Sequence, residues 1–170
     1  FHETRGERDA VLDTRIERFR WLYSWFKDSA SRKRVAKALE DALPAFRNTP
    51  WWSYGMAEWA TMLLATGEPG IRVEARKIAL DGRDAWPGTE GAAWCDSLIR
   101  MIESRKLKVS GEGTTGEGLP SLRVSYRNVP KIWFRAWRVD QTAQATAAKD
   151  AVRRLEPDTE WQIDLPPTPD

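Results

Sequence analysis

The 170-residue sequence has one histidine, His2, and one cysteine, Cys95. A single imidazole near one end gives a Ser-His-Asp or Cys-His catalytic arrangement no basis. One cysteine can form neither an internal disulfide nor a cysteine metal cage, and no histidine spacing suits a metal ion. Cys95 stands in an apolar stretch, which predicts burial as a small hydrophobic residue. The sequence therefore predicts no catalytic residues, no cofactor and no metal site.

An excess of charge of one sign is also lacking. Lys and Arg number 27 against 25 for Asp and Glu, whereas nucleic-acid-binding domains usually carry a clustered basic face. The richest basic run, residues 32–34, fits the solvated face of a helix. No apolar run approaches 18 residues and no signal peptide is recognisable. We therefore expect no nucleic-acid partner and no insertion of this segment into a membrane.

Glycines at 111–118 do not form a phosphate-binding motif. No lysine follows them in the spacing of a P-loop, and no G-x-G-x-x-G opens a helix. Carboxylates are plentiful but lie beside Lys and Arg on polar faces, where solvation and i,i+4 pairing account for them. A hydrolase with paired carboxylates remains the weakest of three functional hypotheses.

Ten tryptophans and a helical hydrophobic period dominate the first two-thirds of the chain. The period predicts one helix over 7–27 and a second that begins after an N-cap at Ser31. Three more helices are predicted over 52–65, 71–85 and 90–102. Pro44 should kink or shorten the second helix. Short connections between helices of this length predict antiparallel neighbours.

The third and fourth helices resemble a tetratricopeptide hairpin. Gly70, Ala75 and Pro87 have spacings like those of the turn glycine, the packing alanine and the terminal proline of that repeat. Thr66 and Ala79 depart from the repeat pattern, and no second copy carries the same landmarks. We expect helical hairpins rather than a repeat array.

After Ser104 the hydrophobic period shortens to two. Short strands are predicted at 107–109, 122–126 and 132–139, with a turn at 128–130 that should pair the last two. An alanine-rich helix is expected over 142–155 and a further strand over 161–165. So few strands make a marginal unit, and both chain ends look cut from a longer protein. The predicted class is α+β, with a helical-hairpin domain over 1–104 and an incomplete antiparallel β-sandwich over 105–170.

Aromatic residues supply the candidate binding sites. Trp51 and Trp52 begin a helix, and Trp21 with Trp25 share a helix face, so either pair could stack on a ligand or peptide. Packing between hairpins is the interpretation we favour for both pairs. A second group of candidates shares one strand face and comprises Trp133, Arg135 and Trp137. With Arg123 and Arg127 on a neighbouring strand, this face could bind an acidic partner or a nucleic-acid strand. Contact of this face with the next domain, or with the rest of its own sandwich, is the favoured alternative.

Residues 86–140 resemble a junction in bacterial alpha-2-macroglobulin-like proteins. There a helical, tetratricopeptide-like region ends in a Pro-x-(Ser/Thr)-x-Gly turn and a Cys-containing helix, and a macroglobulin β-sandwich begins. The matching positions are Pro87, Thr89, Gly91, Cys95, Val124, Tyr126, Arg127, Asn128, Val129, Phe134, Arg135, Val139 and Asp140. The resemblance covers about a third of the chain closely.

This resemblance implies a function for the parent protein rather than for a site in this segment. Members of the family are thought to trap proteases at the bacterial envelope. The implied partners are proteases and the remaining domains of the parent chain, in the periplasm, at the cell envelope or outside the cell. Cys95 is followed by Asp96-Ser97-Leu98 and therefore lacks the thioester signature of some members. We expect a non-catalytic structural or interaction segment; a tetratricopeptide-like adaptor for peptides or proteins is the alternative.

Overall fold

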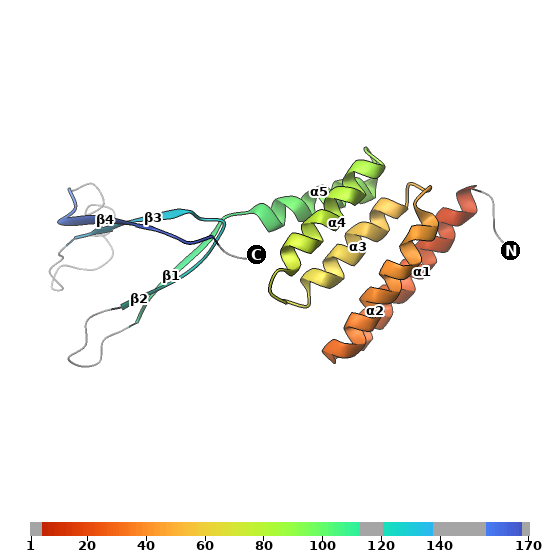
Figure 1. Cartoon of the computed structure of the whole chain (residues 1–170), viewed down its shortest axis with the longest axis horizontal. Coiled ribbons are helices and arrows are strands. Elements are labelled where there is room, and N and C mark those ends of the chain that lie inside the picture. Colours follow the sequence, from red (N-terminus) through yellow and green to blue (C-terminus); the bar gives the residue numbers. More distant parts are fainter. Residues whose placement is uncertain (1–4, 113–120, 138–155, 168–170) are drawn as a thin grey trace, which may run out of the picture. The chain divides into compact units, whose positions relative to one another are not determined.

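The computed structural model describes residues 5–112, 121–137 and 156–167. Its helices come first and its strands follow, which confirms the predicted α+β class (Figure 1). The chain divides into two compact units, one up to Ser104 and one from Arg105 onward. Each unit has its own architecture.

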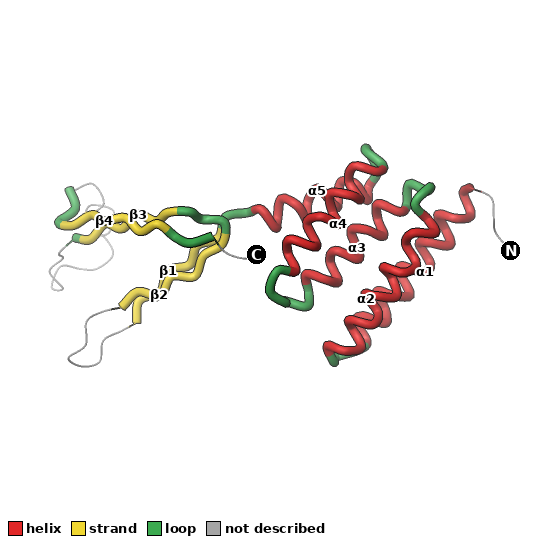
Figure 2. Tube along the Cα trace, in the orientation of Figure 1, coloured by secondary structure: helices red, strands yellow, loops and turns green. Residues whose placement is uncertain are grey.

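The helical unit contains five α-helices and one short 3-10 helix among the described residues. Their bounds are α1 Arg5–Trp25, α2 Ser29–Ala42, the 3-10 helix η1 Leu43–Phe46, α3 Trp52–Leu64, α4 Ile71–Ala85 and α5 Glu90–Glu103. Within this unit the helices lie side by side, joined by short turns (Figure 2).

Local capping sets the helix ends. Asp28, not Ser31, is the N-cap of α2, because its carboxylate accepts a hydrogen bond from the Ser31 backbone N–H at 2.7 Å. Pro44 ends α2 as predicted, since the chain continues as η1. Gly70 precedes α4 with a φ of 77°, a left-handed conformation that favours glycine. Thr89 is the N-cap of α5, and its hydroxyl oxygen accepts a hydrogen bond from Ala92 N–H at 3.1 Å.

One hydrophobic core fills the helical unit. All five α-helices and η1 contribute to it. Its largest fully buried apolar side chains are Leu12, Ile16, Leu39, Leu43 and Cys95. The predicted burial of Cys95 is thus confirmed.

Helices α3, α4 and α5 approach one another closely around Ser53. The Ser53 hydroxyl donates a hydrogen bond to the carbonyl of Gly82 at 2.6 Å, and the Cys95 thiol donates to the carbonyl of Ser53 at 3.5 Å. A Cβ on Gly82 would lie 2.8 Å from Cys95 Sγ, and one on Gly91 would lie 2.2 Å from the backbone nitrogen of Tyr54. The missing side chains at Gly82 and Gly91 therefore set how closely the three helices pack.

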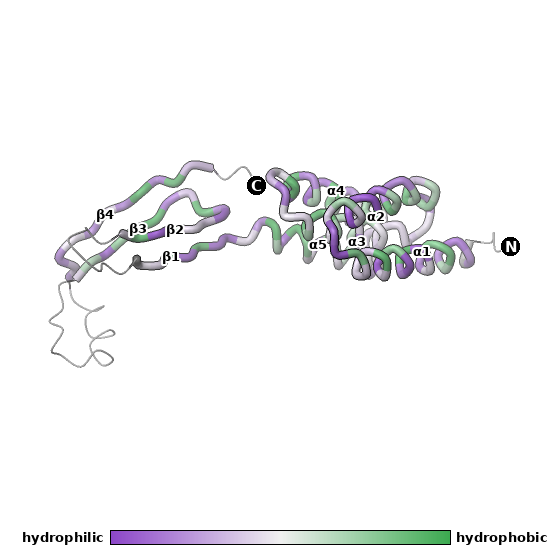
Figure 3. Tube along the Cα trace, turned by 90° about the horizontal axis from the view of Figure 1, so that it is seen from below, coloured by the Kyte–Doolittle hydropathy of each residue, from purple (hydrophilic) through white to green (hydrophobic). Residues whose placement is uncertain are grey.

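The second unit holds two separate two-stranded antiparallel sheets within its described residues. The strands are β1 Lys106–Glu112, β2 Ser121–Arg127, β3 Lys131–Ala136 and β4 Thr159–Asp164. β1 pairs with β2 and β3 pairs with β4. Hydrophilic and hydrophobic residues alternate along these strands (Figure 3).

The predicted pairing of the strands on either side of residues 128–130 is wrong. Asn128 has a φ of 55°, and Pro130 has no N–H with which to extend a ladder. The Pro130 carbonyl instead accepts from Leu165 N–H at 2.8 Å, just beyond β4. Each strand therefore pairs across a longer connection. The helix expected over 142–155 lies outside the described residues.

Candidate interaction surfaces

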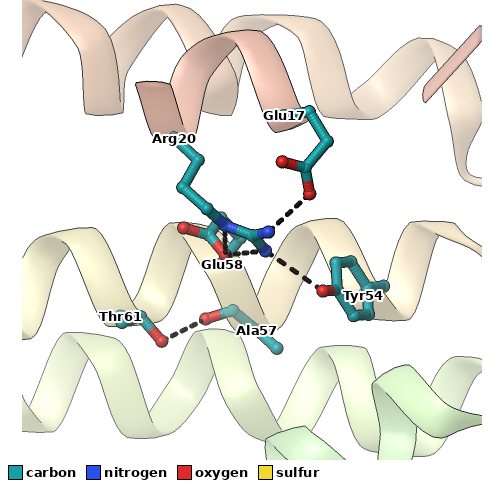
Figure 4. A network of polar contacts seen from close by, with 6 residues as sticks. All are labelled: Glu17, Arg20, Tyr54, Ala57, Glu58 and Thr61. Atoms are coloured by element: carbon teal, nitrogen blue, oxygen red, sulfur yellow. Dashed lines mark hydrogen bonds and ion pairs between the residues drawn. The ribbon is translucent and has the colours of Figure 1, made fainter. Parts of the chain in front are cut away.

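Glu58 is the buried carboxylate of the described part of the chain. From α1, Arg20 donates to one Glu58 carboxylate oxygen through Nη2 at 2.8 Å and Nε at 3.2 Å (Figure 4). Arg20 Nη2 also donates to the Tyr54 hydroxyl at 3.1 Å, and Nη1 pairs with Glu17. The hydrogen bonds to Glu58 and, next, to Tyr54 raise the pKa of Arg20 above its usual value. Glu58 is thus bound to a fixed cation, so the network joins α1 to α3.

The described residues gather no metal-ligating cluster, and their cysteine is buried. No group of three or more His, Cys, Asp or Glu side chains within the described ranges could hold a metal ion. Burial raises the pKa of the Cys95 thiol to about 12, so this thiol is protonated at neutral pH. A thiol in that state is a poor nucleophile.

The structure places Trp51 and Trp52 in the helical unit with little free surface. The Trp52 side chain is in the core, with the Arg47 guanidinium 5.7 Å from its ring centroid. Trp51 is half-buried and stacks on Tyr54 at 4.9 Å, and Tyr54 meets Trp94 edge to face. Trp52 therefore offers no ring to a ligand, which corrects its candidacy as a stacking platform. The alternative of packing between helices fits both rings.

Trp21 and Trp25, unlike Trp52, are exposed to solvent. The two residues are 59% and 67% exposed, and their rings stack on each other with centroids 5.5 Å apart. Trp21 lies on the side of α1 opposite Leu12, because nine residues correspond to two and a half helical turns. Packing between hairpins was the expectation for this pair, and in the described structure it is wrong.

The polar face of the β3–β4 sheet contains two of the predicted binding residues. Trp133 is 61% exposed with Lys131 Nζ 5.7 Å from its ring centroid, and Arg135 points to the same side. Cross-strand acids compensate the cations: Lys131 pairs with Asp164 at 3.1 Å and Arg135 with Glu160 at 3.3 Å. This face carries an exposed aromatic ring but no uncompensated pair of cations.

The structure differs from the predicted binding face at Trp137 and at the two arginines of β2. Trp137 follows the end of β3 and is half-buried. Arg123 and Arg127 belong to β2, which pairs with β1 and not with β3. The predicted combination of these arginines with Trp133 on neighbouring strands is therefore wrong.

The arginines of β2 share a face with lysines of β1, a surface that sequence analysis missed. This basic face is defined by Lys106, Lys108, Arg123 and Arg127, which the pairing register places on one side of the sheet. Polar and apolar side chains alternate along residues 105–110, which indicates that the lysines share one face of a strand. Only the pairing of β1 with β2 shows that this face also holds the β2 arginines.

Apolar side chains occupy the other face of the β1–β2 sheet. Leu107, Val109 and Leu122 are 49%, 45% and 52% exposed, and Val124 and Tyr126 complete the row. The matching face of β3–β4 holds buried Ile132 and the stacked rings of Phe134 and Trp161, 5.1 Å apart. The β-unit thus has an apolar surface that is only partly covered within the described residues.

Open pockets are also present among the described residues. One, of about 400 Å³, is at the α4–α5 turn beside Arg83, Thr89 and Asp96. Arg83 is already paired with Asp84 at 2.7 Å. The other, of about 320 Å³, lies beside Tyr126, whose hydroxyl donates to the carbonyl of Pro166 at 2.9 Å. In the first pocket the charge of Arg83 is thus offset by neighbouring acids, and no charged side chain lines the second.

None of the helices among the described residues is long and apolar enough to cross a bilayer. Comparison with protein families, with curated proteins and with solved structures found no significant match to this chain.

Proposed function

We propose that this chain is a non-catalytic structural and interaction segment that joins a helical-hairpin domain to the first strands of a larger β-sandwich. The observation that carries the proposal is the contrast between the two units. The helical unit has a complete core, whereas Leu107, Val109 and Leu122 of the β-unit are each about half exposed. Two-stranded sheets are marginal alone and gain stability when further strands cover their apolar face. Additional strands of the same protein are the natural cover.

The resemblance of residues 86–140 to bacterial alpha-2-macroglobulin-like proteins supports a specific parent. In that setting the segment is scaffold within a protease-trapping inhibitor of the periplasm, cell envelope or extracellular space. The parent's other domains and the attacking protease are its partners. The buried, protonated Cys95 agrees with a segment that contributes no reactive thiol.

Hydrogen exchange tests the sandwich proposal. This chain is compared with a longer polypeptide from the same reading frame. We expect amides of β1 and β2 to exchange at least about tenfold more slowly in the longer polypeptide, since each tenfold step corresponds to about 1.4 kcal/mol of added local stability. Amides of α3–α5 should be unchanged. A reading frame that ends near Asp170, or equal exchange in both proteins, contradicts the proposal.

Protease capture tests the parent function. The longer polypeptide is incubated with trypsin, and hydrolysis of a protein substrate is compared with hydrolysis of a small peptide. An enclosing trap should reduce the first and spare the second. Equal inhibition of both, or inhibition of neither, rejects the trapping function while leaving the scaffold proposal to the exchange experiment.

A tetratricopeptide-like adaptor is the second candidate, favoured by the exposed Trp21–Trp25 pair. An adaptor should hold a peptide against these rings. Titration with a proline-rich peptide would then shift the tryptophan emission of the wild-type chain and not that of the Trp21→Ala variant. Identical responses from both proteins would exclude this pair as the adaptor surface.

A further inference from the structure

Helices α3, α4 and α5 pack with their backbones almost in contact. The Ser53 hydroxyl of α3 donates directly to the carbonyl of Gly82 in α4 at 2.6 Å. Gly91 of α5 lies so close to α3 that a Cβ would stand 2.2 Å from the Tyr54 nitrogen. Eight of the 13 residues of α3 are buried. Elements packed this closely lose many contacts at once when one of them moves, so we expect the three helices to unfold together.

Helix α1 is much less buried. Leu12 and Ile16 are the buried residues among its described side chains, although the helix has 21 residues. Trp21 and Trp25 of the same helix are exposed. A segment with few buried apolar side chains belongs to the less stable parts of a fold. The helical unit thus combines a closely packed part with a part that is less firmly held.

Polar side chains make several of the contacts between α1 and α3. Arg20 donates to Glu58 and to the Tyr54 hydroxyl (Figure 4). The Tyr23 hydroxyl donates to the carbonyl of Met62 at 2.8 Å. Water can replace each of these partners when the helices separate. Glu58 would then be hydrated, so separation leaves no unpaired charge in an apolar environment. We therefore expect α1 to separate from α3 more readily than α5 does.

Cation–π contacts join α1 to α2 and to the 3-10 helix η1. The Arg32 guanidinium of α2 lies 5.3 Å from the ring centroid of Tyr23 in α1. The Arg15 guanidinium of α1 lies 5.2 Å from the ring centroid of Phe46 in η1. These contacts stay intact if the three elements move together. Residues 5–46, the N-terminal hairpin, therefore form one supersecondary unit.

We propose that the N-terminal hairpin is a latch, which opens as a unit while α3, α4 and α5 stay folded. Supersecondary motifs open in this way at a lower free energy than the whole domain. The boundary lies at Arg47, because its carbonyl accepts from Trp86 Nε1 at 3.2 Å and so stays with the end of α4. Opening removes Arg20 from α3 and presents Tyr54 and Glu58 to other molecules. The latch does not depend on the parent protein being a protease trap.

Native-state hydrogen exchange of the full chain tests the latch. Amides of α1 and α2 should exchange from the opened form, whereas the slowest amides of α3 and α5 exchange only when the whole helical unit unfolds. We expect the protection factors of the slowest α1 and α2 amides to be at least about tenfold lower than those of the slowest α3 and α5 amides. Equal protection of the two sets overturns the proposal.

Thr89→Ala separates a latch from a single cooperative unit. The Thr89 cap of α5 is present in the closed and the opened form alike, so its loss leaves the opening equilibrium unchanged. The slowest α3 and α5 amides should exchange about fivefold faster, and those of α1 and α2 should stay within about 1.5-fold of wild type. Equal acceleration of both sets would show that the helical unit opens only as a whole and would overturn the latch.

Arg20→Met removes a contact that the closed form alone contains. It should therefore accelerate the exchange of both sets of amides at least about tenfold. The matched control is Arg18→Met, the same change at an exposed position of α1, which should leave exchange within about twofold of wild type. Unchanged exchange of the α1 and α2 amides in Arg20→Met, or equal acceleration by Arg18→Met, would show that Arg20 does not hold the latch closed and would overturn the proposal.

Discussion

Gly91 of α5 lies directly against the backbone of Tyr54 in α3, so close that a Cβ on Gly91 would stand 2.2 Å from the Tyr54 nitrogen. Backbone atoms cannot move aside as a flexible side chain can. Gly91→Ala should therefore force α5 away from α3 and lower the free energy of unfolding by about 3 kcal/mol, at the upper end of overpacking costs. Urea unfolding followed by circular dichroism measures the change.

Gly55→Ala provides the comparison. Its Cβ would meet Leu43 Cδ2 at 2.4 Å, but this atom is the end of a side chain that can change rotamer. We expect a smaller loss, about 1–2 kcal/mol. A larger cost for Gly55→Ala than for Gly91→Ala would mean that the α3–α5 contact is not the tightest constraint of the two.

Thr89 should contribute measurably through its cap. Its hydroxyl accepts the Ala92 N–H at the start of α5, and Thr89→Ala leaves that donor without the acceptor. The expected loss is about 1 kcal/mol in thermal or urea unfolding. Thr89→Asp keeps an acceptor next to the positive end of the helix dipole and should retain most of the stability. Equal losses for the two variants would assign the effect to something other than capping.

The Arg20–Glu58 pair should behave as a coupled unit. Arg20→Met leaves a buried carboxylate without its cation and should cost about 2–3 kcal/mol, below the range for fully buried pairs because the Arg20 side chain is 38% exposed. The Arg20→Met/Glu58→Leu double variant should recover much of that loss, since no buried charge remains. A double-mutant cycle on unfolding free energies gives the coupling, and simple additivity would contradict it.

Alkaline pH should destabilise the helical unit through Cys95. Burial raises the pKa of its thiol from 9.0 to about 12, so above pH 9 the unfolded chain loses a proton that the folded chain retains. The free energy of unfolding therefore falls as the pH rises from about 9 to 12. Burial also raises the pKa of Tyr23, which adds a decline in the same direction.

Cys95→Ala isolates the contribution of the thiol. The variant should be less stable than the wild-type chain at neutral pH because of the cavity, and the difference should shrink steadily above pH 9. Parallel pH profiles for the two proteins would show that Cys95 ionisation is not linked to unfolding. Reaction of the wild-type thiol with a disulfide reagent should be correspondingly slow unless urea is added.

The helices could be predicted with small errors in their ends, because local signals determine where a helix begins and ends. The apolar period, Pro44, Gly70 and Thr89 act within a few residues of where they stand. The predicted N-cap Ser31 and the observed N-cap Asp28 both have side chains that favour this position, and only the hydrogen bond between them shows that Asp28 is the acceptor. The order of helices and then strands followed from the change of period at Ser104.

Contacts between residues far apart in the chain could not be predicted from the sequence. β2 pairs with β1, which precedes it in the chain, and β3 pairs with β4, which lies far beyond the turn at 128–130. The short connection at 128–130 had favoured the pairing of β2 with β3. Packing was expected for both tryptophan pairs, and only the folded helices show that Trp52 is buried whereas Trp21 and Trp25 are exposed. The basic face became visible once the register of β1 and β2 was known.

The stacked Trp21 and Trp25 rings give the α1–α2 hairpin an intrinsic optical label. Two indoles with centroids 5.5 Å apart and planes inclined by 20° have coupled electronic transitions, whose circular dichroism vanishes when the rings separate. Both rings are also open to aqueous quenchers, unlike Trp52 in the core. Because both rings belong to α1, unfolding of this helix can be followed in real time in the unmodified chain.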